Sequence, residues 1–254
     1  MTITENSWAT YIERLRKVND AAAGKILSWL ERYGYPTDQN RINALLDYAY
    51  GISTKYGEAA TALACEMYDG IAAASGVILP AAVPAATATM EEVAVTVVGT
   101  GKTGNNEIIS SAVGRLVKRA GVDTMMNNAI RDGAEWAWIP AGDTCAFCIA
   151  LASRGWQTAS RKALRNGHAE HIHSNCDCTY AVRFNERTNV AGYDPDRYYE
   201  LYANADKGGS PTDKINAMRR EFYAENRERI NAQKRDAYAK RKEREASAAE
   251  ELDV

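Results

Sequence analysis

Residues 38–74 read DQNRINALLDYAYGISTKYGEAATALACEMYDGIAAA, and their apolar side chains recur every three or four positions. This spacing predicts one long amphipathic helix, because residues three and four apart share a helix face. An unbroken helix of this length spans about 55 Å at 1.5 Å per residue. Gly51 and Gly57 are the positions where a kink or a break is expected. The stretch indicates a mainly α-helical protein.

The preceding segment, residues 7–32, shows the same helical spacing. Ser7 is the expected N-cap of this first helix, and Gly34 and Pro36 end it. Two long helices joined by such a short link predict an antiparallel pair over residues 1–76. The expected apolar face of the first helix comprises Trp8, Ile12, Leu15, Val18, Ala22, Ile26 and Leu30.

Residues 77–135 are interpreted as a connector followed by helices. The Ala/Pro/Thr-rich start is expected to be extended and exposed, whereas residues 91–98 (EEVAVTVV) fit either a short strand or a helix. Helices are expected over residues 107–120 and then 123–131, with Asp123 capping the second. The loop sequence GTGKTG before them lacks the first glycine of a P-loop, so nucleotide binding is not expected.

The composition is that of an ordinary globular protein, with 46% hydrophobic and 25% charged residues and a formal net charge of −2. This charge gives no global reason to expect nucleic-acid or membrane binding. No signal peptide is visible, and prolines and acidic residues interrupt the most apolar stretch, residues 71–98. The protein is therefore expected in a reducing compartment with its cysteines as thiols.

Residues 185–254 are interpreted as a C-terminal helical region with a charged tail. A short helix is expected over residues 196–203, followed by a Gly-Gly-Ser-Pro break and a long helix over residues 212–245. The long helix is densely charged and has few apolar positions. It fits either a solvated helix or an arm that contacts protein or DNA.

Residues 136–184 contain four of the five cysteines and all three histidines. Cys145-Ala-Phe-Cys148 is followed, after twenty-four residues, by His173-Ser-Asn-Cys176-Asp-Cys178. Each half places soft ligands at chelating spacing, and four such ligands form a closed tetrahedral zinc site. The predicted ligands are Cys145, Cys148 and His173, with either Cys176 or Cys178 as the fourth.

The other two histidines, His168 and His171, are expected to be exposed or to lie outside the ligand set. A closed site has no position for water, so the zinc is predicted to be structural and the protein is not expected to be an enzyme. The sequence His168-Ala-Glu170 is similar to the His-x-Glu of zinc deaminases, but the Cys-x-x-Cys lies on the wrong side of it. An apolar cluster around the site is expected from Trp136, Trp138, Phe147, Leu151 and Trp156.

The stretch GDTCAFCIALASRG at residues 142–155, together with HSNCDC at residues 173–178, resembles the phage head-morphogenesis family, often called MuF-like. The resemblance is closest to the minor capsid or "capsid maturation" variant of actinobacteriophages. Ser174 stands where the family often has Pro, which removes a rigid turn but no ligand. The resemblance is clear over about residues 140–180, and the helical layout extends it loosely along the chain.

The resemblance implies a low-copy minor capsid protein that acts in procapsid assembly or in DNA packaging and ejection. It implies a place in the virion, inside the capsid, after a stage in the host cytoplasm. The implied partners are the phage portal, capsid or scaffolding proteins, with possible self-association and DNA contact through the C-terminal helix, and no membrane.

The fold class that follows is mainly α, with long N-terminal helices, a small zinc-stapled α+β module and a charged C-terminal helix. Two other functions remain open. One is a zinc-dependent enzyme: a capsid maturation protease, a nuclease or a deaminase-like protein. The other is a zinc-containing nucleic-acid-binding module.

Overall fold

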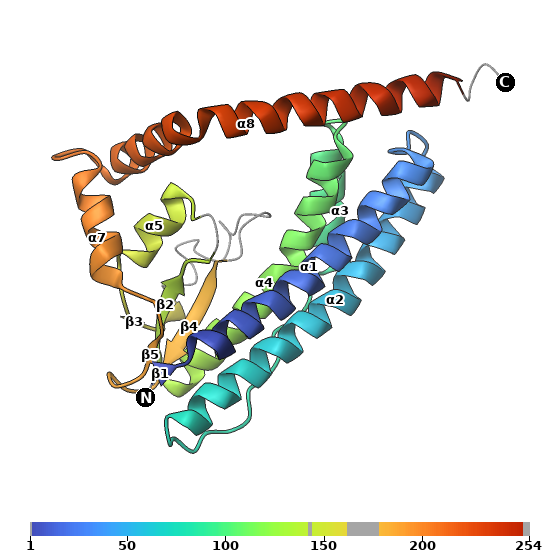
Figure 1. Ribbon diagram of the computed structural model, residues 1–254. Helices are drawn as coiled ribbons and strands as arrows, with labels where there is room; N and C mark the ends of the chain where they lie inside the picture. The colour runs from blue at the N-terminus through green and yellow to red at the C-terminus, as the bar shows by residue number, and fades with distance from the viewer. Residues whose placement is uncertain (1, 142–143, 162–177, 251–254) are drawn as a thin grey trace.

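A computed structural model describes residues 2–141, 144–161 and 178–250, and it is mainly helical as predicted (Figure 1). The helices are α1 (Glu5–Tyr33), α2 (Gln39–Ala74), α3 (Met90–Gly101), α4 (Asn106–Asp132), α5 (Ala146–Ala152), α7 (Pro195–Asn204) and α8 (Pro211–Glu250). The strands are β1 (Thr2–Ile3), β2 (Glu135–Ile139), β3 (Gln157–Thr158), β4 (Thr179–Arg183) and β5 (Asn189–Val190). No helix in this described part is long and apolar enough to cross a membrane.

The long helices α1 and α2 form the predicted antiparallel pair. Arg14, near the start of α1, forms an ion pair at 2.8 Å with Glu66, near the end of α2. The first helix begins earlier than expected, because Thr4 is its N-cap and accepts a hydrogen bond from the Ser7 amide at 3.2 Å. Helix α2 continues without a break through Gly51 and Gly57, the two positions where a kink or a break was expected. At one of them, Gly57, a Cβ atom would lie 2.8 Å from the Thr87 methyl group, so the glycine serves close packing.

Residues 91–98 adopt the helical alternative rather than the strand. Thr89 and Glu92 form a capping box: the Glu92 amide donates to Thr89 Oγ1 at 3.2 Å, and the Thr89 amide donates to Glu92 Oε2 at 2.9 Å. Val93 and Val97, one turn apart, are buried. Capping and packing on α4 therefore override the β-propensity of the segment.

The two helices expected over residues 107–120 and 123–131 are one continuous helix, α4. The prediction that Asp123 caps a separate helix is wrong, since its carboxylate lies one turn from Arg119 at 3.8 Å. Gly121 packs against α2, where a Cβ atom would lie 3.3 Å from the Ala60 carbonyl oxygen. Gly121 is thus a close-contact point between α2 and α4 inside one continuous helix.

The connector between α2 and α3 is extended, and hydrogen bonds to side chains hold it against the bundle. The Ala82 amide donates to the Asp69 carboxylate at 2.8 Å, and the Val83 amide donates to the Asn128 side chain at 2.9 Å. The side chains of the connector differ in exposure: Ile78 is fully exposed, but Ala88 is buried. The connector is therefore fixed to α2 and α4 rather than only exposed.

The small sheet has the order β3-β2-β4 with antiparallel pairing, and it lies beside the end of the bundle that carries the N-terminus (Figure 1). This arrangement, together with α5, confirms the α+β character predicted for residues 136–184. One core cluster includes Trp8, Tyr68, Met125, Trp136 and Tyr180, so the first three predicted segments share a core. Strand β1 pairs in parallel with β5, a contact that the sequence did not indicate.

The C-terminal helices occur close to where they were predicted, as α7 and α8. Helix α8 packs against α5 and α7 and then runs on as a single long helix (Figure 1). Met218 is buried near its start, whereas Phe222 and Tyr223 are exposed.

Candidate metal centre

The pairing of β2 with β4 brings Cys178 beside the chain segment that leads to α5. Ile139 lies opposite Thr179 in the ladder, so the residues after β2 run alongside the residue before β4. The Ala141 amide donates a hydrogen bond to Cys178 Sγ at 3.4 Å, and the Cys178 thiol donates one to the Ala141 carbonyl oxygen at 3.8 Å.

Cys145 and Cys148 lie at the beginning of α5. Cys145 is the N-cap with an extended backbone, and its carbonyl accepts the first helical hydrogen bond from Ile149 at 3.0 Å. Residues three apart on a helix share a face, so the two sulfurs belong to the same side of this turn. Cys148 is buried and Cys145 is half-buried.

The three described cysteines of this region belong to one apolar environment. Cys148 and Cys178 are members of the same core cluster, and Cys145 packs against it. The apolar cluster predicted here is confirmed: Trp136, Trp138 and Leu151 are buried members, and Phe147 and Trp156 pack against them. The structure therefore places the three described cysteines of this region in or against one core cluster, but not close enough together to hold a metal ion by themselves.

The structure describes only some of the predicted zinc ligands. His173 and Cys176 lie outside the described residues, as do His168 and His171. Within residues 2–141, 144–161 and 178–250, no three His, Cys, Asp or Glu side chains lie close enough together to hold a metal ion. The zinc ion and its ligands accordingly stay a prediction.

Aromatic side chains pack on one another in the same core cluster as the cysteines. The Tyr180 ring packs edge-on against Trp136 at 4.7 Å and Trp138 at 4.9 Å between ring centroids. Burial raises the pKa of Tyr198, Arg197 opposes this shift, and Cys178 and Asp194 add to it. Tyr198 belongs to α7, and no signal in the sequence linked that helix to the cysteines.

A family model described as VG15 protein matches residues 2–205. The chain belongs to the VG15 protein family. VG15 is a phage gene family, so the expectation of a phage protein is confirmed, while the finer MuF-like identity stays a prediction. The match runs from β1 to the end of α7, and α8 of this VG15 protein lies beyond it. No curated protein and no solved structure shows a significant match to the chain.

Proposed function

We propose that this VG15 protein is a minor capsid, head-morphogenesis protein whose Cys/His module is held by one structural zinc ion. The observation that carries the proposal is the buried Cys178, whose sulfur accepts the Ala141 amide at 3.4 Å in the same core cluster as Cys148. Membership of a phage family supports the functional half of the proposal.

The donor set fits zinc. Cys145, Cys148 and His173, with Cys176 or Cys178, would supply soft thiolates and one imidazole nitrogen, which zinc binds in tetrahedral sites. The bound ion would supply a cross-link between α5 and the strand β4. Because four protein ligands fill the coordination sphere, the ion would have no position for a substrate or water, which favours a structural role over an enzymatic one.

The proposed action is scaffolding. A module fixed by zinc gives a rigid end to the helical bundle, and the long helices offer surfaces for the portal, capsid or scaffolding proteins or for a second copy. In this proposal the protein joins the procapsid in the host cytoplasm, acts in assembly or in DNA packaging and ejection, and remains inside the capsid.

Metal analysis of protein purified under reducing conditions tests the zinc site. The wild type is expected to hold about one zinc ion per chain. Cys145→Ser and Cys148→Ser are expected to lower this content, and Cys178→Ser lowers it if Cys178 rather than Cys176 is the fourth ligand. Cys65→Ser, in α2, is the matched control and keeps it. A wild-type protein without zinc, or full zinc content in all three variants, would refute the proposal.

Cobalt substitution separates the structural site from the zinc-enzyme alternative. A closed site with several thiolates is expected to give intense tetrahedral d–d bands and sulfur-to-cobalt charge transfer that added azide leaves unchanged. An azide-dependent spectrum would reveal an open coordination position and favour the zinc-dependent enzyme.

Virion analysis tests the role in the head. Mass spectrometry of purified particles is expected to detect the protein, and a phage with a nonsense mutation in its gene is expected to yield fewer infectious particles. Cys148→Ser is expected to reduce incorporation, with Cys65→Ser again as control. Infectious particles produced at normal yield without this protein would exclude the proposed role.

Charge asymmetry favours DNA contact by α8 as a second activity of the same protein. Residues 227–244 carry eight Lys or Arg and three Asp or Glu, a net charge of +5 in a chain whose net charge is −2. Such a segment attracts phosphate backbones with a strong dependence on salt. In fluorescence anisotropy with a labelled duplex, replacing Lys240, Arg241 and Lys242 by Gln is expected to weaken binding and flatten the salt dependence. Equal binding by the wild type and this variant would remove this second activity.

A further inference from the structure

The connector between α2 and α3 lies on the bundle in the way that an extended peptide lies on its receptor. Residues 76–88 contain no helix or strand, and Ala88 is the only one of them that is buried. Leu79 and Ala82 pack partly on the core, whereas Val83 is 60% exposed. Apolar burial along the connector is thus limited, and polar contacts with the bundle supply much of what holds it.

The Asn128 side chain of α4 contacts the connector as a neighbouring strand would. Its Oδ1 accepts the Val83 amide at 2.9 Å, and its Nδ2 donates to the Val83 carbonyl oxygen at 2.8 Å. Asn128 is only 2% exposed, and a second bond from Nδ2 to the Thr124 carbonyl oxygen, at 2.8 Å, fixes the orientation of the amide. A buried amide held in this way is a preorganised site for the main chain of an extended segment.

Further side chains of α2 and α4 contact the main chain on both sides of residue 83. The contacts are Asp69 with the Ala82 amide (2.8 Å), Thr124 Oγ1 with the Ala85 amide (3.0 Å), and Arg131 with the carbonyl oxygens of Pro80 and Ala81 (3.1 Å each). The prolines at 80 and 84 fit, because the N–H groups that are bound belong to residues 82, 83 and 85. The groove between α2 and α4 therefore recognises main chain at these positions.

One position of the groove also selects a side chain. A Cβ atom at Gly57 of α2 would lie 2.8 Å from the Thr87 methyl group and 3.9 Å from the Ala120 Cβ of α4. The missing side chain of Gly57 thus leaves a notch that Thr87 fills. The notch admits a small side chain and excludes a large one, because the surrounding helices are already closely packed.

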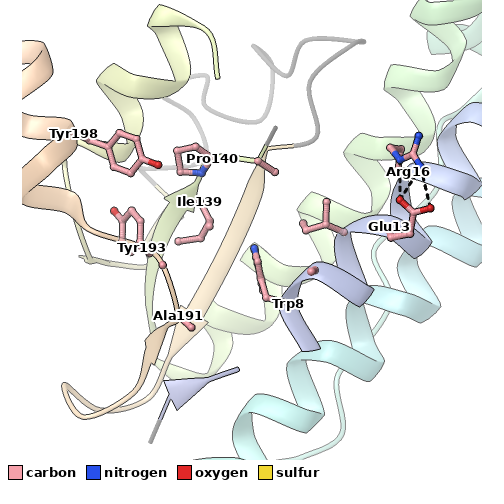
Figure 2. Close-up of a pocket in the computed structure, with 12 residues that line it drawn as sticks. Trp8, Glu13, Arg16, Ile139, Pro140, Ala191, Tyr193 and Tyr198 are labelled. Carbon is pink, nitrogen blue, oxygen red and sulfur yellow. Dashed lines mark hydrogen bonds and ion pairs between the residues drawn. The ribbon is translucent and has the colours of Figure 1, made fainter. Parts of the chain in front are cut away.

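This groove is separate from the pocket of about 410 Å³ beside Trp8, which Figure 2 shows. That pocket is lined by residues of α1, of β2 and the segment after it, of the turn after β5, and of α7. Neither the predicted zinc ligands nor the basic segment of α8 belongs to the groove.

We infer that the groove between α2 and α4 binds an extended, Ala/Pro/Thr-rich segment of a partner protein, with a small residue in the Gly57 notch, and that the connector occupies the groove as a competitor within the chain. Main-chain groups are alike in every extended segment, so the contacts that hold the connector are open to a partner as well. Tethering gives the connector an effective concentration on the order of millimolar. A partner therefore displaces it only when it is held nearby or makes further contacts.

The probe is a fluorescein-labelled peptide of residues 79–87, LPAAVPAAT, and fluorescence anisotropy measures its binding. In one variant of the full chain, a Gly/Ser linker of equal length replaces residues 77–87, which empties the groove and keeps the buried Ala88 and the cap at Thr89. This variant is expected to bind the peptide saturably, and the wild type at least about tenfold more weakly, because its connector competes. A folded linker variant that does not bind, or equal binding by both proteins, overturns the inference.

Peptide variants test which groups the groove recognises. Val83→Ser changes a mostly exposed side chain and is expected to leave the affinity unchanged. Val83→Pro removes the amide that Asn128 accepts and is expected to weaken binding at least about tenfold. Thr87→Trp is too large for the Gly57 notch and is expected to have a similar effect. Equal binding of all these peptides contradicts specific recognition in this groove.

Hydrogen exchange in the wild type, followed by NMR, does not depend on the folding of the linker variant. Millimolar unlabelled peptide is expected to remove protection from the amides of Ala82, Val83 and Ala85, while those of α1 keep theirs. Unchanged protection of these three amides overturns the inference. A concentration-dependent dimer of the wild type that the peptide dissociates would assign the groove to a second copy, and would overturn a partner protein as the occupant.

Discussion

The helical bundle and the small sheet stabilise themselves in different ways. In the bundle, side chains cap the N-terminus of every helix from α1 to α4, and small residues let the helices approach closely. In the sheet, β2 and β4 have five residues each and β3 has two. Two five-residue strands with only a two-residue third strand need packing against helices to be stable. The capping residues of the bundle are Thr4, Asp38, Thr89 and Asn105.

Buried polar atoms without a hydrogen-bond partner occur in both regions: Trp138 Nε1, Thr179 Oγ1 and Tyr180 Oη in the sheet, and Tyr11 Oη, Ser53 Oγ and Thr54 Oγ1 in the bundle. Such atoms destabilise a fold unless other interactions compensate. Local capping interactions therefore support the bundle, whereas the sheet depends on tertiary contacts and, in our proposal, on zinc. The predictions that follow test this contrast.

The largest expected effect is on the sheet alone. Cys148→Ser, or removal of zinc by a chelator, is expected to cost on the order of 3 kcal/mol or more, because metal binding contributes directly to folding. In hydrogen exchange, the amides of β2 and β4 should lose protection, while those of α1, α2 and α4 keep theirs. Equal loss in both regions would show that the bundle and the sheet unfold as one unit.

The next effect is on the bundle alone. Gly121→Val is expected to destabilise the protein by about 2–3 kcal/mol, because the Ala60 carbonyl oxygen lies 3.3 Å from the added Cβ. Gly24→Val, on the exposed side of α1 with no atom within 4 Å of its Cβ position, is the matched control. Urea unfolding measures both, and similar stabilities of the two variants would contradict close packing at Gly121.

The free energy of unfolding is expected to depend on pH through Asp123, which lies where the bundle approaches the sheet. Burial raises the pKa of Asp123 from 3.8 to about 6, while Arg119 opposes the shift and Glu92 adds to it. The folded state therefore binds this proton more tightly than the unfolded state, and the associated stability is lost as pH rises from about 4 through 6. Relative to the Asp123→Asn variant, the free energy of unfolding of the wild type is expected to fall by about 1–2 kcal/mol between pH 4 and pH 7.

Urea unfolding at a series of pH values measures this difference. Asp47→Asn, at an exposed position of α2, serves as the control and should follow the wild type. If the difference in unfolding free energy between the wild type and Asp123→Asn stayed constant across this pH range, burial would not raise the pKa of the Asp123 carboxyl group.

The smallest expected effect is at the start of α3. Thr89→Ala removes the side-chain half of the capping box and is expected to cost about 1 kcal/mol. Thermal unfolding followed by circular dichroism measures it. A neutral result would mean that packing of Val93 and Val97 alone selects helix over strand in this segment.

The spacing of apolar residues predicted the long helices, because helical periodicity is a local property of the chain. The same reasoning placed two helices where α4 is continuous, since Asp123 is a residue type that often caps a helix, whereas here it lies inside one. The cysteine spacing predicted which residues belong together. It did not show that the Ala141 amide contacts Cys178, which follows from the register of β2 and β4.

By itself, the sequence determined the helical class, the antiparallel α1–α2 pair and the gathering of cysteines in residues 136–184. These depend on residues within a few turns of one another or on ligand types at short spacing. Only the tertiary structure decided the pairing of β1 with β5 and the pocket beside Trp8. Those features arise where segments far apart in sequence meet, and local periodicity carries no information about such contacts.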